Sequence, residues 1–397
     1  MENKSITAEP EKCCGCGACK AACPVRAISM AENEFGFVMP QIDHTLCINC
    51  GKCSRVCAFS SPEKYISKDL PIKAYAAALK DDAVLKKSAS GGVFAGTACH
   101  ILDEGGVVFG AAMDKQFNVK HIGISSKSKL HFLQGSKYTQ SDTSGVFASI
   151  KKQLESGKKV LFSGTPCQVA ALKAFLGKNQ DNLYTIDLVC HGVGSNKMFK
   201  EDIEYLRGKY KSVVKAVSFR SKRKGWGTGG DLVLEDKIKD YSPINSPYYY
   251  YYLDSSIFRD SCYYCPYATN RRVGDITIGD FWRIETLFKK IDIDTNKGVS
   301  CLIVNTEKGK KLVGMLQDGF KLIEADFEEI AMRNGNLTHA SIINPNRGIV
   351  LHKYLNNGYK GIYNYFKKNT RKARLKSRIK SIIPKRVKKH IKTIIMK

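Results

Sequence analysis

Eight of the fifteen cysteines fall in two runs near the N-terminus, and each run has the spacing C-x2-C-x2-C-x3-C. The runs are Cys13, Cys16, Cys19 and Cys23, then Cys47, Cys50, Cys53 and Cys57. Three thiolates from one short turn can bind a cubane iron–sulfur cluster, while the fourth thiolate of each run binds the other cluster. The spacing therefore predicts two 4Fe-4S clusters, which carry single electrons.

This crossed pattern assigns four ligands to each cluster. The first predicted set is Cys13, Cys16, Cys19 and Cys57, and the second predicted set is Cys47, Cys50, Cys53 and Cys23. Gly15, Gly17 and Gly51 lie between ligands, where a chain wrapped closely around a cluster needs small residues or a positive φ. A zinc site would need only four such cysteines and would leave the other half unexplained. Cys14 is extra, and we expect its thiol to face away from the cluster.

Another pair of cysteines lies where predicted strands end. Residues 159–163 and 183–189 have the apolar composition of buried strands, and glycine, threonine and proline open a helix after the first strand. Cys167 lies in the first turn of that helix, and Cys190 directly follows the second strand. Because right-handed crossovers make such strands parallel neighbours, both thiols are expected at the carboxyl edge of one sheet, where α/β proteins bind ligands.

Cys262 and Cys265 form a C-x2-C-P turn that supplies two more thiols. Together with the two thiols at the sheet edge, they would complete the ligands of a third cluster. Other interpretations stay open, because Cys262 and Cys265 also suit half of a zinc site, and Cys167 also suits a core thiol or a nucleophile at a helix N-terminus. Cys99 and Cys301 lie in apolar segments and are expected to be core residues.

Two segments have the composition of anion-binding sites. Residues 88–92, SASGG, precede a helical run and place backbone N–H groups at a helix N-terminus, which suits a phosphate. The basic run 219–227, FRSKRKGWG, suits an anionic substrate or cofactor, although a solvated loop is its ordinary interpretation.

The composition is that of a soluble globular protein. Hydrophobic residues make up 43% of the 397 positions and charged residues 25%. The first residues lack the apolar stretch of a secretory signal, and no run approaches the roughly 18 apolar residues of a membrane span. An odd number of cysteines at metal-ligand spacings argues against a disulfide framework. We therefore expect a cytoplasmic protein.

The net charge of +27 is concentrated at the C-terminus, since residues 367–397 contain fourteen lysines and arginines and no acidic residue. Apolar residues recur there at helical spacing, so the tail is expected to form two short basic helices broken at Pro384. Such helices can bind an anionic membrane at its inner face. Packing on the body or contact with an acidic partner is the alternative, and nucleic acid is not expected because no nucleic-acid-binding module accompanies the tail.

Six segments between residues 88 and 282 resemble the beta subunit of coenzyme F-420 hydrogenase/dehydrogenase. They are SASGGVFAGTA (88–98), GSKYTQS (135–141), GTPCQVAAL (164–172), DLVCHGVGS (187–195), SFRSKRKGWG (218–227) and CYYCPYATNRRVGDITIGDFW (262–282). The segments follow one another in order, which is more specific than any single motif.

This resemblance implies an iron–sulfur flavoprotein that binds FAD and couples hydride exchange with a small molecule to single-electron transfer through the clusters. It implies that the third cluster binds the third predicted set, Cys167, Cys190, Cys262 and Cys265. It also implies a flavin near Ser90, Gly91, Gly92, Lys137 and Tyr138. It indicates no catalytic residue. The other hypothesis is a non-catalytic subunit that relays electrons to a redox partner protein.

The predicted fold class is α+β followed by mixed α/β, because strand and helix patterns alternate after residue 72. Residues 1–60 are expected to form a bacterial ferredoxin-like dicluster domain, and residues 61–71 a linker. Residues 72–366 are expected to form a flavin-binding and iron–sulfur oxidoreductase domain with an N-terminal part, 72–160, and a C-terminal part, 161–366. Residues 367–397 are expected to form a basic helical tail.

Overall fold

The computed structural model describes residues 10–288 and 291–382. Its largest sheet contains eight strands: β3 (Lys73–Leu79), β4 (Val107–Met113), β5 (Val119–Ile124), β6 (Val160–Gly164), β7 (Leu183–Leu188), β11 (Ile276–Asp280), β12 (Ser300–Val304) and β13 (Phe320–Glu324). They lie in the order β13-β3-β12-β11-β7-β6-β4-β5. The four central strands β4, β6, β7 and β11 are parallel, and antiparallel strands extend the sheet on both sides. The predicted parallel pairing of the strands near residues 160 and 185 is confirmed.

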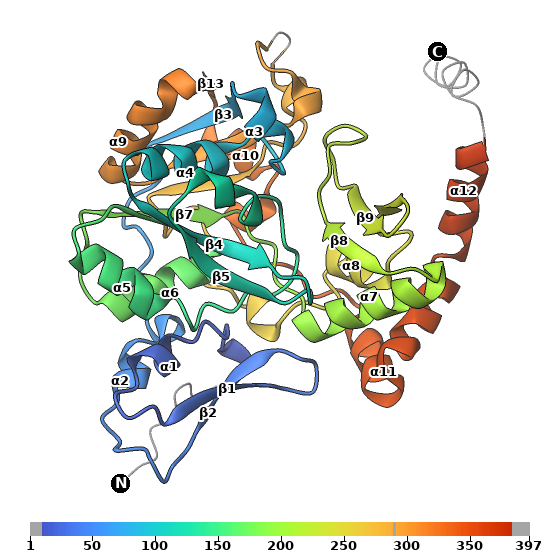
Figure 1. The fold of residues 1–397 in the computed structure, drawn as a ribbon, viewed down its shortest axis with the longest axis horizontal. Coiled ribbons are helices and arrows are strands. Elements are labelled where there is room, and N and C mark those ends of the chain that lie inside the picture. Colours follow the sequence, from blue (N-terminus) through green and yellow to red (C-terminus); the bar gives the residue numbers. More distant parts are fainter. Residues whose placement is uncertain (1–9, 289–290, 383–397) are drawn as a thin grey trace.

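Helices cover both faces of this sheet (Figure 1). The helices of one face are α3 (Asp82–Lys86), α4 (Val93–Asp103) and α9 (Glu307–Leu316), and those of the other are α5 (Phe147–Glu155) and α6 (Pro166–Leu176). In β6, Leu161 packs with α4 and α9, whereas Val160 and Phe162 pack with α5 and α6. The apolar run of β6 is therefore buried on both faces, as is typical of a central parallel strand. At the antiparallel end, α10 (Phe327–Ala331) packs against β3 and β12.

A smaller lobe lies beside the sheet (Figure 1). It contains the antiparallel strands β8 (Val214–Ser218), β9 (Gly230–Leu234) and β10 (Ile238–Tyr241), with α7 (Asn196–Tyr210), α8 (Pro247–Leu253) and α11 (Arg347–Asn369). The run of five tyrosines forms α8, whose N-cap Ser246 accepts a bond from the backbone N–H of Tyr249 and whose first residue is Pro247. Four of these tyrosines are buried and pack with α7, so the aromatic run forms the core of the lobe.

The N-terminal module contains α1 (Ala18–Ala22), β1 (Ile28–Glu32), β2 (Val38–Ile42) and α2 (Lys52–Arg55), with β1 antiparallel to β2. Each helix starts in a cysteine run after a glycine with a left-handed backbone, Gly17 with φ +73° and Gly51 with φ +68°. The expectation of positive φ at these glycines is confirmed. Glycine adopts this left-handed backbone readily because it has no Cβ atom.

The N-terminal module packs directly on the larger part of the protein. Ala18 and Ala58 lie in the same apolar cluster as α5 and α6. The Tyr267 hydroxyl donates to the carbonyl of Ala58 over 2.7 Å, and Phe59 contacts the Tyr267 ring edge to face at 5.6 Å. The two cysteine runs are therefore fixed against the body of the protein.

Short 3-10 helices connect these elements: η1 (Pro10–Lys12), η2 (Ala58–Ser60), η3 (Pro62–Lys64), η4 (Lys127–Phe132), η5 (Asp260–Cys262), η6 (Ile284–Thr286), η7 (Thr295–Lys297), η8 (Gln317–Gly319) and η9 (Gly335–Leu337). Within the described ranges, no helix combines the length and apolar character needed to cross a membrane.

The basic tail, residues 367–397, begins within the last turn of α11, which ends at Asn369, and continues into α12 (Arg371–Ile382). A helix in the first half of the tail was predicted and is present. The predicted break at Pro384 and the second helix lie outside the described residues.

Candidate functional site

The third predicted set of cysteines is built on the carboxyl edge of the central sheet. Cys167 is the second residue of α6, directly after β6, and Cys190 follows the end of β7. At the start of α6, the Gln168 side chain accepts a hydrogen bond from the backbone N–H of Thr165 over 3.0 Å. The Thr165 hydroxyl lies 3.1 Å from Cys167 Sγ. The capping box therefore fixes the first turn of α6 and with it the Cys167 thiol.

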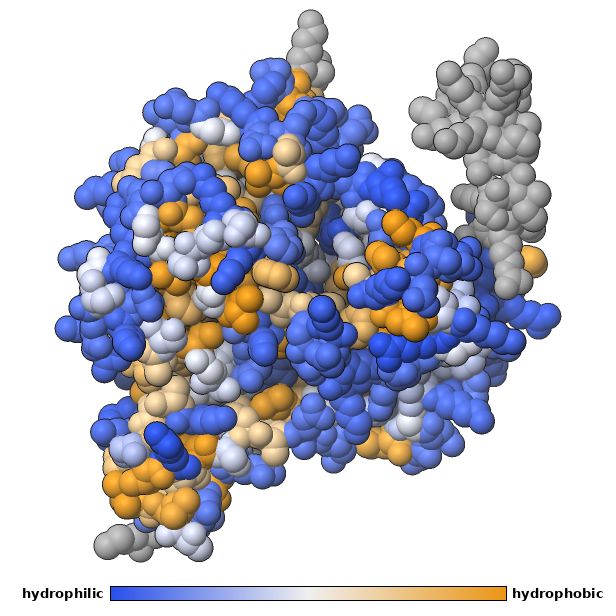
Figure 2. All heavy atoms as spheres, in the orientation of Figure 1, coloured by the Kyte–Doolittle hydropathy of each residue, from blue (hydrophilic) through white to orange (hydrophobic). Residues whose placement is uncertain are grey.

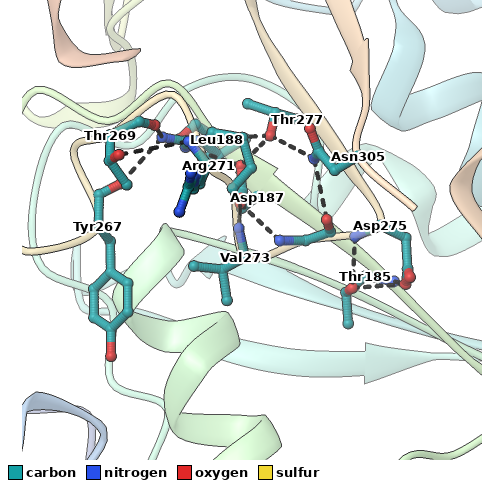
Figure 3. A network of polar contacts seen from close by, with 12 residues as sticks. Thr185, Asp187, Leu188, Tyr267, Thr269, Arg271, Val273, Asp275, Thr277 and Asn305 are labelled. Atoms are coloured by element: carbon teal, nitrogen blue, oxygen red, sulfur yellow. Dashed lines mark hydrogen bonds and ion pairs between the residues drawn. The ribbon is translucent and has the colours of Figure 1, made fainter. Parts of the chain in front are cut away.

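A buried ion pair connects the end of β7 to the segment that follows Cys265. Figure 3 shows the polar network around one of its members, Asp187. The side chains of Asp187 and Arg272 are 0% and 1% exposed and form an ion pair of 3.0 Å. Asp187 also accepts bonds from the backbone N–H groups of Val273 and Gly274, at 3.0 and 2.8 Å, and from the Thr277 hydroxyl at 2.6 Å. The carboxylate is fully hydrogen-bonded, as a buried charge requires.

Arg272 also donates to the Thr277 hydroxyl over 3.2 Å and to three backbone carbonyls. Its guanidinium donates to Tyr267 and Thr269, at 3.0 and 3.1 Å, and to Leu188 at 3.1 Å. Leu188 precedes Cys190 by two residues, and Tyr267 follows Cys265 by two. One side chain therefore sets the positions of the two chain segments that carry these cysteines.

The thiols of this third set lie close enough to influence one another's ionisation. Burial raises the pKa of Cys190 well above its usual range, and the charges of Cys262, Cys167 and Cys265 raise it further. Burial likewise raises the pKa of Cys262 to about 12. Four partly buried thiols from three segments converge at one place, which fits the ligand demand of a 4Fe-4S cluster.

The first predicted set surrounds a common cavity. The lining of this cavity includes Cys13, Cys16, Cys19 and Cys57 together with Met30, Pro40 and Phe59. The backbone N–H of Gly15 donates to Cys13 Sγ over 3.3 Å, and N–H bonds of this kind tune the potential of a bound cluster. An apolar cavity ringed by the four predicted thiols fits a 4Fe-4S cluster.

Cys14 connects the first and third sets, so the expectation that its thiol faces away from the cluster is wrong. Hydrogen bonds to Cys16 and Cys167, together with burial, raise the pKa of Cys14 well above its usual range. The hydrogen bond from Cys14 lowers the pKa of Cys167 to about 7 against the effect of burial. Tertiary packing explains the orientation of this loop. Gln140 donates to the carbonyl of Cys14 over 3.2 Å, and the body of the protein covers this side of the loop.

The second predicted set is nearer the surface. Cys23 and Cys53 pack in one small apolar cluster with Cys19, and Cys23 Sγ accepts a bond from a backbone N–H over 3.2 Å. Cys47 is partly exposed and Cys50 is exposed. Neither of them belongs to the apolar cluster that contains Cys23 and Cys53. Figure 2 shows apolar side chains gathered at this end of the molecule.

The apolar residues at this end include Leu46 and Ile48, which are 52% and 61% exposed and flank Cys47. An exposed apolar patch beside a predicted cluster is typical of a surface that contacts another protein.

In the part of the chain that the structure describes, no three histidine, cysteine, aspartate or glutamate side chains are grouped to bind a single metal ion. A 4Fe-4S cluster spreads its four ligands more widely, because each thiolate binds a different iron.

The glycine-rich loop before α4 is packed against the sheet. Gly91 lies so close to β3 that a Cβ atom there would be 2.0 Å from the carbonyl oxygen of Ala77. Gly92 has φ +82° and is the N-cap of α4, and no side chain caps this helix. The Ser90 hydroxyl donates to the carbonyl of Val299 over 2.9 Å. The start of α4 is therefore uncapped, whereas Ser90 and Gly91 have structural contacts with the sheet.

Arg220 connects this loop to Tyr138, so two of the segments predicted to lie near a flavin do meet. Its guanidinium donates to the Tyr138 hydroxyl at 3.2 Å and to the carbonyl of Ala89 at 3.5 Å, and it forms a 2.6 Å ion pair with Asp280. The ring of Tyr138 stacks on Tyr252 with 4.8 Å between the centroids.

Lys137 points back to its own loop, where it donates to the carbonyl of Gln134 over 2.8 Å. Burial lowers the pKa of Lys137 to about 7, so this amine changes charge near neutral pH.

The basic run 219–227 is mostly neutralised within the protein. Arg223 pairs with Asp231 and Asp240, and Lys224 pairs with Asp240. Lys222 donates to the carbonyl of Ser90 over 2.6 Å, and burial lowers its pKa to about 8. These contacts leave few of the charges for an anionic ligand.

Two tryptophans that the sequence reasoning did not single out border this region. Trp226 and Trp282 stack with ring centroids 5.1 Å apart, and the Trp226 indole N–H donates to Asp280 over 3.2 Å. Their signal was the rarity of tryptophan, since the chain has only these two. The stacked pair closes one side of the region around Arg220.

Three family models match the chain. Residues 12–61 match the 4Fe-4S dicluster domain, residues 74–148 match the N-terminal part of the coenzyme F-420 hydrogenase/dehydrogenase beta subunit, and residues 157–329 match its C-terminal part. Among curated proteins, one component of the F(420)H(2) dehydrogenase of Methanosarcina mazei is 22% identical over 329 residues, which cover 79% of this chain and 84% of that protein.

A solved chain from the F-420-reducing NiFe hydrogenase complex of Methanosarcina barkeri is also similar. It is 18% identical, with 76% of this chain and 92% of that chain covered and a TM-score of 0.46.

Proposed function

The chain belongs to the family of coenzyme F-420 hydrogenase/dehydrogenase beta subunits and contains a 4Fe-4S dicluster domain, and from this premise we propose that it is an iron–sulfur flavoprotein oxidoreductase. In this proposal, residues 1–60 carry two clusters, residues 61–71 are a linker and residues 72–366 carry a third cluster and FAD. Electrons pass singly through the clusters, and a small molecule donates or accepts hydride at the flavin.

The observation that carries this proposal is the meeting of the first and third cysteine sets. Cys16 of the first set packs against the same apolar cluster as Cys167 and Cys265 of the third, although about 150 residues separate Cys16 from Cys167. Two clusters bound on these ligands would be neighbours, which single-electron transfer requires. An isolated ferredoxin would have no use for a third set of thiols at the carboxyl edge of an α/β sheet.

A bound flavin supplies the exchange between a hydride and two single electrons, which clusters alone cannot perform. The residues proposed to border it are Ser90, Gly91, Gly92, Lys137 and Tyr138. The uncapped N-terminus of α4 suits a phosphate group, and the contact of Arg220 with Tyr138 and Ala89 connects this helix start to the second segment.

A second candidate function is electron relay without catalysis. Its support is the exposure of Cys50 and of the apolar neighbours Leu46 and Ile48, which would let the second cluster exchange electrons with a partner protein. Both functions need a redox partner at this end of the molecule, so they differ only in what happens at the flavin.

Anaerobically purified full-length protein is expected to contain about twelve iron atoms, because three cubane clusters bind four irons each. It is also expected to take up FAD during reconstitution and to show a flavin absorption band. Iron, sulfide and flavin analysis measures both values. Iron at about eight atoms would restrict the clusters to the dicluster domain, and failure to take up FAD would exclude the flavoprotein function. Bound FAD that turns over only after a partner protein is added would favour the relay.

The basic tail is proposed to bind the inner face of an anionic membrane peripherally, which would place this cytoplasmic protein at the membrane. Helix α12 stands away from the rest of the molecule in Figure 1, and Leu375 on this helix is 60% exposed. A basic helix with exposed aliphatic residues suits an anionic bilayer surface.

Deleting residues 371–397 is expected to abolish sedimentation with phosphatidylglycerol vesicles while leaving iron and flavin content unchanged. This truncation keeps α11 and the buried Thr370 intact. Phosphatidylcholine vesicles are the control, since they lack the net negative charge that the basic residues need. Equal binding to both vesicle types, or loss of iron on truncation, would contradict a role as a membrane anchor.

A further inference from the structure

Arg259 is buried between the first and third cysteine sets. Its side chain is among the most buried charged groups, since the residue is 3% exposed. The guanidinium donates to the carbonyl of Cys13 over 2.5 Å and to the carbonyl of Val38 over 3.0 Å. Cys13 belongs to the first set, whereas Arg259 itself lies three residues before Cys262 of the third set. The side chain therefore connects the ligand loops of both sets.

Gln140 orients this guanidinium. Its side-chain oxygen accepts a bond from Arg259 over 3.0 Å, and its side-chain nitrogen donates to the carbonyl of Cys14 over 3.2 Å. The backbone of Gln140 is fixed as well, because its N–H donates to the carbonyl of Gly194 over 2.8 Å. The hydrogen bonds of Gln140 therefore fix the position of the Arg259 guanidinium.

No carboxylate neutralises Arg259 in the portion of the chain that the structure describes, where its partners are carbonyls, an amide and the Met39 sulfur. The other two deeply buried arginines differ, since Arg220 pairs with Asp280 and Arg272 pairs with Asp187. A buried cation without a counter-ion is costly. A nearby anionic group would remove that cost.

Ligand cysteines of two sets adjoin Arg259. Cys13 of the first set accepts a hydrogen bond from the guanidinium through its backbone carbonyl, and Cys262 of the third set lies three residues further along the chain. In the proposed function these cysteines bind clusters as thiolates, which carry negative charge. The buried positive charge therefore lies next to ligands of two separate sets.

We propose that Arg259 is a shared positioning residue that neutralises part of the negative charge of both neighbouring clusters, raises their reduction potentials together and keeps their ligand loops in contact. Reduction adds a negative charge to a cluster, and a buried cation stabilises the reduced form. The inference deepens the proposed function, because it assumes clusters on the first and third sets. In this way one residue keeps the reduction potentials of the two clusters similar, so that electrons can pass between them.

The test uses full-length Arg259→Met protein, which has lost the charge but retains a long apolar side chain. Potentiometric titration followed by electron paramagnetic resonance is expected to show both clusters reduced at lower potential. We expect the reduction equilibrium of each to shift at least tenfold, or about 59 mV for one electron. The cluster of the second set is expected to be unchanged. Arg371→Met is the matched control, since Arg371 is an exposed arginine on α12 whose charge water and salt screen, and all three potentials are expected to stay unchanged.

Two further variants separate charge from geometry. Arg259→Lys preserves the charge and is expected to keep both potentials near those of the unchanged protein, with altered spectral line shapes because the forked bonds are lost. Gln140→Leu removes the orienting bond and is expected to lower the same two potentials by a smaller amount. If Arg259→Met protein fails to bind iron, the reduction potentials of Gln140→Leu protein test the inference instead.

Unshifted potentials in Arg259→Met, or an equal shift of all three clusters, would overturn the inference alone. Absence of a third cluster from the unchanged protein would instead contradict the proposed function, and iron analysis detects that before any variant is made.

Discussion

Replacing Cys265 with serine is expected to remove about four irons from the protein and to leave the two N-terminal clusters in place. Cys265 is partly buried, as are the other three cysteines of the third set. Burial raises its pKa, and the charges of Cys167 and Cys262 raise it further. Serine cannot replace a thiolate as a ligand of comparable strength. Iron and sulfide analysis, with electron paramagnetic resonance of the reduced protein, measures the loss.

The functional consequence of this substitution is expected to be a break in electron transfer. The first and second clusters should still accept electrons from a chemical reductant, whereas the flavin should no longer be reduced through them. Hydride exchange between a donor and the flavin should continue. This pattern follows from the proposed function, in which the third cluster connects the first cluster, next to Cys16, with the flavin domain that carries Cys167 and Cys265.

Cys99→Ser is the matched control, because Cys99 is a half-buried thiol on α4 that belongs to no set. It is expected to retain all of the iron. Unchanged iron in Cys265→Ser would return Cys262 and Cys265 to a zinc site or to core packing.

Replacing Asp187 with alanine is expected to lower the free energy of unfolding by about 3–5 kcal/mol, the usual cost of removing one partner of a buried ion pair. The change would leave Arg272 charged, buried and unpaired. It would also leave the backbone N–H groups of Val273 and Gly274 without their acceptor. Urea denaturation followed by circular dichroism, under anaerobic conditions, measures the loss.

The same substitution is expected to loosen the third cysteine set. Arg272 positions the carbonyls of Leu188 and Tyr267, which adjoin Cys190 and Cys265. Iron content should therefore fall together with stability. A double variant, Asp187→Leu with Arg272→Met, is expected to recover much of the stability, because it removes both buried charges at once.

Asp82→Ala provides the control for an exposed ion pair, since Asp82 pairs with Lys297 at the surface. It is expected to leave the free energy of unfolding nearly unchanged, because solvent screens such pairs. A similarly small effect of Asp187→Ala would contradict the role assigned to the buried pair.

Local features of this protein were readable from the sequence. The spacing of the cysteine runs and the glycines between them predicted turns with left-handed backbones, and the structure has these at Gly17 and Gly51. The strands β6 and β7 and their parallel pairing were also predicted, from two apolar runs separated by a helical segment. Such features depend on neighbours a few residues apart, so a short window contains their cause.

The start of α5 depends on a local side-chain contact: this helix begins at Phe147, not directly after Asp142. The backbone N–H of Ser144 donates to the Asp142 side chain over 2.8 Å, which forms a turn that delays the helix. Helix α11, which is interrupted by a kink at Gly358, was not predicted at all. Its packing on α7 and α8 through Tyr354 and Phe366 depends on the rest of the lobe.

Electron chemistry could be inferred from the cysteine spacing because ligands of one cluster lie within a single turn of the chain. Only the tertiary structure decided how the three sets meet. Cys14 faces Cys167 because the body of the protein covers the first ligand loop, and Arg259 reaches Cys13 from 246 positions further along the chain. The sequence near either residue does not predict a contact of this kind, because the two residues meet only after the sheet has formed.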